Sequence, residues 1–145
     1  MATNEQILSG LKRLQAGDLT VQLPVSSDPT QDEIASTFNQ TIRMLNEFAA
    51  EVTRIARETG PEGRFGGQAE VPSARGTWKD LVTNINTMSA VLTDSVRDAG
   101  NMTRAAASGD FSYKLSYPAS GEMQELHTAL SRWQNNAVSS AASTP

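Results

Sequence analysis

An internal repeat constrains the fold of this chain more than any other feature. Three segments begin with glycine and carry a large apolar residue two positions later: Gly17-Asp18-Leu19, Gly63-Arg64-Phe65 and Gly109-Asp110-Phe111. Gly63 follows Gly17 by 46 residues, and Gly109 follows Gly63 by 46. A repeat of this length predicts an array of small modules, because one copy is too short to bury its own apolar face and must stack or pair with another.

Helical patterns flank each glycine segment. Apolar residues recur at alternating spacings of three and four, which places them on one face of an α-helix and, over the longer stretches, in heptads. We therefore expect helices over residues 4–16, 29–59 and 77–108, and a last one over 121–138. Asp28 and Pro29 suit a helix start, and Gly60-Pro61 suits a helix end. Residues 139–145 are small and polar, and we expect them to be disordered.

The heptad positions define a seam that should form the core of a helical bundle. Thr41, Ser95 and Ala99 are small or polar positions within it. The expected core residues are Ile7, Leu11, Leu14, Ile34, Phe38, Leu45, Phe48, Val52, Ile55, Trp78, Leu81, Ile85, Met88, Leu92, Met102, Met123, Leu126, Leu130 and Trp133.

Three connectors, residues 17–28, 63–76 and 109–120, separate the predicted helices. A dozen extended residues reach about 40 Å, whereas a helix of about 13 residues is only ~20 Å long. Each connector can therefore run back along one helix and start the next one parallel to it. The residues expected to pack the connectors between the helices are Gly17, Leu19, Leu23, Gly63, Phe65, Ala69 or Val71, Gly109, Phe111 and Leu115. A monomer supplies two helices per repeat, and a parallel dimer would supply four.

Two heptad-patterned helices joined by such a connector resemble the HAMP domain of bacterial sensors. The second repeat carries the pattern most fully, in residues 63–72 and 76–81 with Glu51–Glu58 before them, and it is similar to the HAMP arrays of hybrid histidine kinases and soluble chemoreceptors. The resemblance covers about residues 4–140. It departs from the family at the start of the second helix, where an acidic residue is common: Glu122 fits, whereas Thr30 and Thr77 do not.

The resemblance implies an all-α fold of three HAMP units, at residues 4–49, 50–95 and 96–138, arranged as parallel homodimeric four-helix coiled-coil bundles stacked end to end. It implies a cytoplasmic signal-relay module of a two-component sensor or chemoreceptor, covalently linked to input and output domains in a longer chain. Two parallel packings of one seam can lie within a few kcal/mol, so an input can shift the balance between them.

Composition and motifs argue against other classes of function. The net charge is −4, and no cluster of lysine and arginine indicates a nucleic-acid surface. The chain has no cysteine, and no apolar run approaches the ~18 residues of a membrane helix. The glycines at 63–67 lack the strand and lysine of a phosphate-binding loop. His127 lacks the flanking residues of a kinase phospho-acceptor, and Trp78 and Trp133 keep heptad spacing, so all three have structural interpretations. We expect no catalysis, cofactor, metal or small-molecule ligand.

Two alternatives stay open. A static coiled-coil spacer would have the same helices without two packing states. A lipid-binding amphipathic bundle would need polar faces rich in lysine and arginine, and the chain holds only 12 such residues.

Overall fold

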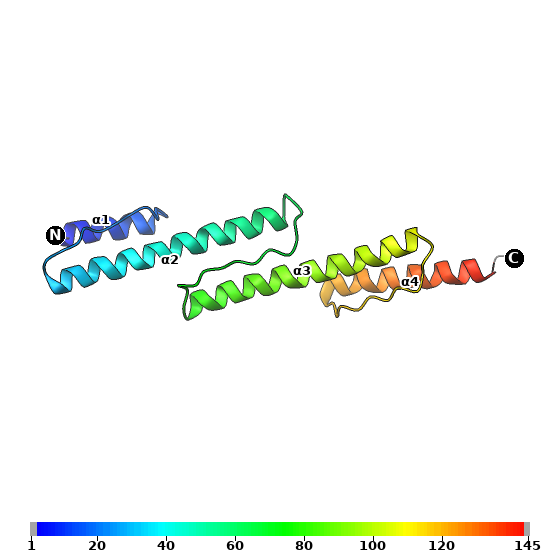
Figure 1. Cartoon of the computed structure of the whole chain (residues 1–145). Coiled ribbons are helices and arrows are strands. Elements are labelled where there is room, and N and C mark those ends of the chain that lie inside the picture. The colour runs from blue at the N-terminus through cyan, green and yellow to red at the C-terminus, as the bar shows by residue number, and fades with distance from the viewer. Residues whose placement is uncertain (1–2, 144–145) are drawn as a thin grey trace. The chain divides into compact units, whose positions relative to one another are not determined.

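The computed structural model describes residues 3–143, and this part of the chain contains four α-helices and no strand (Figure 1). The helices are α1 (Asn4–Gln15), α2 (Pro29–Thr59), α3 (Thr77–Ala107) and α4 (Gly121–Ser143). The all-α prediction is confirmed, as are the starts of α2, α3 and α4. The expectation for the end of the chain is wrong in part, because α4 continues through residues 139–143. This stretch holds alanines and serines and no glycine or proline, so nothing in it stops a helix. Residues 144 and 145 lie outside the described part.

The start of each early helix is fixed by a side chain. Thr3 caps α1 in a capping box with Gln6, in which each side chain accepts a hydrogen bond from the other residue's backbone N–H. Asp28 caps α2 by accepting from the N–H groups of Thr30 and Gln31, and Pro29 occupies the first helical position. These caps explain why the sequence locates both starts to within a residue.

Helices α1 and α3 end in the same way. The N–H groups of Asp18 and Asp110 donate back into the last helical turn, at 2.9 Å and 2.8 Å. Gly17 and Gly109 precede them with φ angles of 88° and 89°, which side chains disfavour and glycine adopts at low cost. Both ends are therefore Schellman-type stops, and the chain leaves the two helices along equivalent paths.

The helices and connectors divide into three helix–connector–helix segments, which we call modules. Module 1 is α1, connector 1 (residues 17–28) and the N-terminal half of α2. Module 2 is the C-terminal half of α2, connector 2 (residues 63–76) and the N-terminal part of α3. Module 3 is the C-terminal part of α3, connector 3 (residues 109–120) and α4. The chain divides into two compact units: the first ends at Asn86 and the second begins at Thr87, so the boundary falls inside α3.

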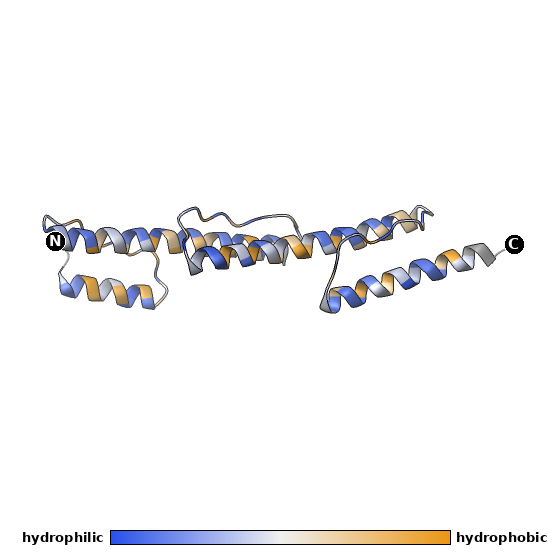
Figure 2. Ribbon diagram, turned by 90° about the horizontal axis from the view of Figure 1, so that it is seen from below, coloured by the Kyte–Doolittle hydropathy of each residue, from blue (hydrophilic) through white to orange (hydrophobic). Residues whose placement is uncertain are grey.

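Within each unit the helices run parallel, because each connector returns along its module before the next helix begins (Figure 1). The helices carry apolar residues at intervals between polar ones (Figure 2). Helix α2 serves two modules through opposite faces: Ala35 and Ile42 are buried on one face, and Met44 and Ile55 on the other. Nine residues separate Ala35 from Met44, which is a rotation of about 180° at ~100° per residue.

Candidate functional site: three connectors and an uncovered helix seam

Connector 1 lies extended against its helices with every second side chain turned inward. Val21 and Leu23 are buried and Leu19 is half-buried, while residues 20, 22 and 24 are exposed. This alternation is that of an extended strand. Leu19 and Leu23 were expected here from the sequence, whereas Val21 was not.

Connectors 2 and 3 show the same alternation. In connector 2, Phe65 is half-buried and both Ala69 and Val71 are buried, so the two alternatives from the sequence are both inward-facing. In connector 3, Phe111 and Leu115 are half-buried. The ring of Phe111 meets that of Trp133 edge to face, with centroids 6.3 Å apart.

An asparagine holds each of the first two connectors at its centre. The side chain of Asn39 accepts from the Leu23 N–H at 2.8 Å and donates to the Leu23 carbonyl at 2.9 Å. Asn86 binds Ala69 in the same two-point manner, at 2.7 Å and 3.0 Å. Each asparagine satisfies both backbone groups of a buried connector residue, which would otherwise be costly to bury. The sequence analysis missed this pair, although both follow an aligned seam residue, Phe38 or Ile85.

A carboxylate on the first helix of module 2 holds the far side of connector 2. Glu51 accepts from the Glu70 N–H at 2.8 Å and pairs with Arg54, which also donates to the Gln68 carbonyl at 2.7 Å. The hydrogen bonds from Arg54 and from the Glu70 N–H lower the pKa of Glu51 to about 2. The connector is therefore tied to α2 and α3 at once.

Asp98 takes the corresponding role in module 3, at 47 residues from Glu51. It accepts from the Ser116 and Tyr117 N–H groups at 2.8 Å and 3.0 Å, and from the Tyr113 hydroxyl at 2.7 Å. Burial raises the pKa of Asp98, but these three hydrogen bonds and the charge of His127 outweigh it, and the pKa lies below its ordinary value. Asp98 was not predicted from the sequence, because a single carboxylate in a helix normally faces solvent.

Helix α4 completes module 3 with two buried polar residues. His127 places Nε2 3.3 Å from the Ser95 carbonyl, and Gln134 donates to the Tyr113 carbonyl at 2.5 Å. Both side chains are buried. His127 therefore lies inside the module, which accords with the structural interpretation of this residue.

Modules 1 and 2 differ in which element carries the glycine where the first helix meets the connector. A Cβ placed on Gly10 would meet Leu23 Cδ2 at 3.1 Å and Val21 Cγ1 at 3.5 Å, so α1 lies against the connector through a glycine. In module 2 the large residue is on the helix: a Cβ on Gly67 would lie 3.1 Å from Ile55 Cδ1. In both modules a glycine of one element therefore lies against a branched side chain of the other.

The seam expected to form the bundle core is largely uncovered in the single chain. Ile55 and Met102 are fully buried. The half-buried members are Ile7, Leu14, Phe38, Leu45, Phe48, Val52, Ile85, Leu92, Met123 and Leu130. The exposed members are Leu11, Ile34, Trp78, Leu81, Met88, Leu126 and Trp133, with exposed fractions between 37% and 60%. The structure thus brings the connector residues against helices but leaves seven large residues of the seam exposed.

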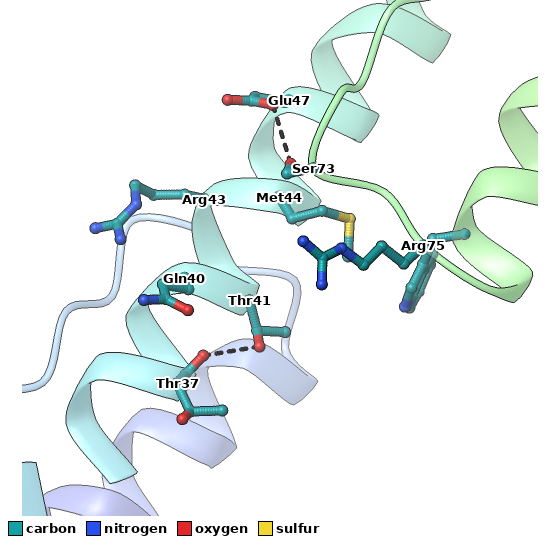
Figure 3. Close-up of a pocket in the computed structure, with 9 residues that line it drawn as sticks. Thr37, Gln40, Thr41, Arg43, Met44, Glu47, Ser73 and Arg75 are labelled. Carbon is teal, nitrogen blue, oxygen red and sulfur yellow. Dashed lines mark hydrogen bonds between the residues drawn. The ribbon is translucent and has the colours of Figure 1, made fainter. Parts of the chain in front are cut away.

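A shallow groove of ≈ 540 Å³ lies on the seam where α2, connector 2 and the start of α3 meet (Figure 3). Thr41 and Trp78 line it, and both are seam positions. Ser73 donates to Glu47 at 3.3 Å across its rim, and Thr41 donates to the Thr37 carbonyl at 2.8 Å. Among the described residues, no cluster of three or more histidine, aspartate and glutamate side chains could hold a metal ion. No described helix is both long and apolar enough to cross a membrane.

Comparison with known families gives one match for this architecture. Residues 5–47 match the family model of the HAMP domain, and they correspond to α1, connector 1 and the first part of α2. No solved structure matches the chain. HAMP domains link the input and output domains of sensor proteins, so the match implies a signal-transduction linker over module 1.

Proposed function

We propose that the chain is a relay of three concatenated HAMP units, which works as a parallel homodimer. It passes a conformational change from an input domain to an output domain of a longer histidine kinase or chemoreceptor chain, in the cytoplasm, and does no chemistry of its own. The family match supports this for module 1. For modules 2 and 3 the support is their correspondence with module 1 in helices, connectors and glycine spacing.

The observation that carries the proposal is the uncovered seam. Large apolar side chains recur at heptad positions along α2, α3 and α4 and remain exposed, as Leu81, Met88 and Leu126 do. Exposed large apolar residues that share one helix face often mark a surface for interaction with another protein. Covering it with the same seam of a second copy yields four parallel helices per module, and each Å² removed from water contributes about 25 cal/mol.

The shared helices supply the means of transmission. The C-terminal half of α2 holds connector 2 through Glu51, while its N-terminal half holds connector 1 through Asn39. A rotation or shift of α2 therefore moves the contacts of both modules together. Helix α3 has the same double role through Asn86 and Asp98.

Cysteine crosslinking tests the dimer, because the chain has no cysteine of its own. We expect Met88→Cys, on the seam, to form an interchain disulfide rapidly. Ala90→Cys is the matched control, because Ala90 is exposed and lies about 160° around α3 from Met88. Analytical ultracentrifugation at micromolar concentration should report a dimer. A folded monomer, or equal crosslinking at both sites, would contradict the packing.

Helix phase separates a relay from a static spacer. One residue inserted at Ala50 rotates the downstream part of α2 by about 100° and moves Val52 and Ile55 off the seam, whereas seven inserted residues restore the phase. In a full-length receptor, we expect the single insertion to lock or invert the output and the seven-residue insertion to be milder. Equal output from both would favour the spacer.

A further inference from the structure

Helices α2 and α3 each belong to two modules. They differ in the segment where one module passes into the next, which we call the join: residues 42–51 in α2 and residues 89–98 in α3. Positions 47 residues apart correspond, as Asn39 and Asn86 do. In α2 the join carries Met44 and Phe48. Met44 forms an apolar cluster with Val71 and Ala74 of connector 2, and the side chains packed against it are Leu45, Phe48 and Val82. The ring of Phe48 also meets Trp78, with centroids 5.7 Å apart. The join in α2 is therefore sealed by apolar contacts.

The corresponding positions in α3 lack this seal. Val91 stands at the position of Met44 and is 42% exposed, and Ser95 stands at the position of Phe48. In the connectors, where the corresponding glycines Gly63 and Gly109 are 46 residues apart, Tyr117 and Ser120 replace the two buried residues Val71 and Ala74. No apolar cluster of buried residues forms here among the described residues of module 3. The larger hydrophobic contribution thus belongs to the α2 join.

The residues of α3 that are buried between positions 89 and 98 are all polar. Ser89, Thr93 and Ser95 are all buried. Thr93 donates its hydroxyl to the Ser89 carbonyl at 2.7 Å, a bond that competes with the helical backbone and weakens the helix slightly. Ser95 is completely buried, and its hydroxyl has no hydrogen-bond partner in the described structure. A buried hydroxyl without a partner destabilises the folded state.

We propose that residues 89–98 of α3 form a compliant joint, at which the helix opens locally far more often than α2 does at residues 42–51. A segment with few apolar contacts and a buried unpaired hydroxyl belongs to the less stable part of a fold. The inference concerns local stability and does not depend on the relay.

Native-state amide hydrogen exchange on the intact chain tests the joint. We expect protection factors over residues 89–98 to be at least about tenfold lower than those over residues 42–51. Equal protection in the two segments, or lower protection in α2, would overturn the inference. Because exchange is measured without any output domain, a failed relay would leave this result unchanged.

Substitutions identify the cause. Ser95→Ala removes the unpaired hydroxyl and should raise protection over residues 89–98 by about tenfold. A buried unpaired polar group raises the equilibrium constant for local opening by about this factor. Ser36→Ala is the matched control, because Ser36 is exposed on α2, shares the gain in helix propensity and loses only an exposed hydrogen bond from Gln40. An equal gain in protection around both sites would refute the role of the buried hydroxyl.

The reciprocal substitution places serine, the residue at position 95 of α3, at the corresponding position 48 of α2. Phe48→Ser should lower protection over residues 42–51 toward the level of residues 89–98. Met44→Val makes a milder version of the same change, and it keeps the test decisive if Phe48→Ser fails to fold. Unchanged protection in Met44→Val, with α2 still folded, would show that the apolar join does not set the difference.

Discussion

Modules 1 and 2 differ from module 3 in how they hold the middle of their connectors. Asn39 and Asn86 each bind a buried connector residue through both backbone groups. Ser131 is the aligned residue in module 3, because it follows the seam residue Leu130 as Asn86 follows Ile85, and no described hydrogen bond joins it to connector 3. Connector 3 is instead held by Asp98 from one helix and Gln134 from the other. Modules 1 and 2 thus share a two-point asparagine contact, whereas module 3 relies on Asp98 and on a single contact from the amide of Gln134.

The residue that follows the first glycine of each connector groups the modules differently. In modules 1 and 3, Asp18 and Asp110 accept hydrogen bonds from the N–H and hydroxyl of the residue two positions later. Module 2 has Arg64 there, and its side chain pairs with Glu62 at 2.7 Å. The entry and the centre of a connector are therefore specified independently, and a repeat can vary at one while keeping the other.

The largest effects should come from what modules 2 and 3 share. Ile55 and Met102 are each fully buried on the first helix of their module. Ile55→Ala and Met102→Ala should each lower the free energy of unfolding by about 2–5 kcal/mol, through lost transfer energy and the cavity left behind. Chemical denaturation measures the change. Hydrogen exchange should localise each loss to the mutated module, and a uniform loss across both units would mean that the modules do not fold separately.

Removing the carboxylate of module 3 should have the next largest effect. Asp98→Asn keeps the size of the side chain but loses the charged acceptor of three hydrogen bonds, and bonds of this kind contribute about 1.5–3 kcal/mol. The pKa of Asp98 is lowered in the folded state. Its stabilisation is therefore complete above the ordinary value of 3.8 and is lost as the pH falls through the folded pKa.

A pH series separates this carboxylate from that of module 2. Measured by denaturation, the difference between the wild type and Asp98→Asn should shrink as the pH falls below about 3.8. The loss of unfolding free energy in Glu51→Gln should also shrink as the pH falls, in this case between pH 4.5 and about pH 2. A deficit for Asp98→Asn that stays constant down to pH 2 would show that the charge of Asp98 does not hold connector 3.

The asparagine clamp sharpens the comparison directly. Asn86→Ala leaves the N–H and carbonyl of buried Ala69 without partners and should destabilise the first unit by about 1–3 kcal/mol. Ser131→Ala, at the aligned position in module 3, should change the unfolding free energy by less than about 0.5 kcal/mol. Thermal denaturation of the two variants is sufficient. Equal losses would mean that Ser131 supports connector 3 in a way that its contacts do not suggest.

The order of helices and connectors could be read from the sequence because local signals specify it. Asp28 and Pro29 start a helix, Gly17 and Gly109 end one, and the heptads fill the space between. The inward face of the connectors was predicted in part: Leu23 and Ala69 are buried, but Val21 was missed. Nothing in the local sequence marks Val21 as buried, because the residue it lies against, Gly10, belongs to another element.

The polar contacts could not be predicted for a related reason. Asn39, Asn86 and Asp98 bind backbone groups 16 to 19 residues away. Neither composition nor spacing indicates which polar residue of a helix faces a connector. The seam was identified from its periodicity, yet the single chain buries only Ile55 and Met102 of it completely. Periodicity shows which residues share a face, and it does not show what covers that face.

The smallest changes in stability should come from alanine substitutions at two helical glycines. Comparing the two separates the effect of crowding from that of helix propensity. Gly100→Ala in α3 places its Cβ near only the mobile end of Arg104, so it should stabilise the protein by about 0.5–1 kcal/mol. Gly10→Ala gains the same propensity, but its Cβ meets Leu23 Cδ2 at 3.1 Å and Phe38 Cζ at 3.4 Å. The crowding should cancel most of the gain and leave a change near zero. Differential scanning calorimetry resolves the two variants, and equal stabilisation by both would mean that α1 has room to spare against connector 1.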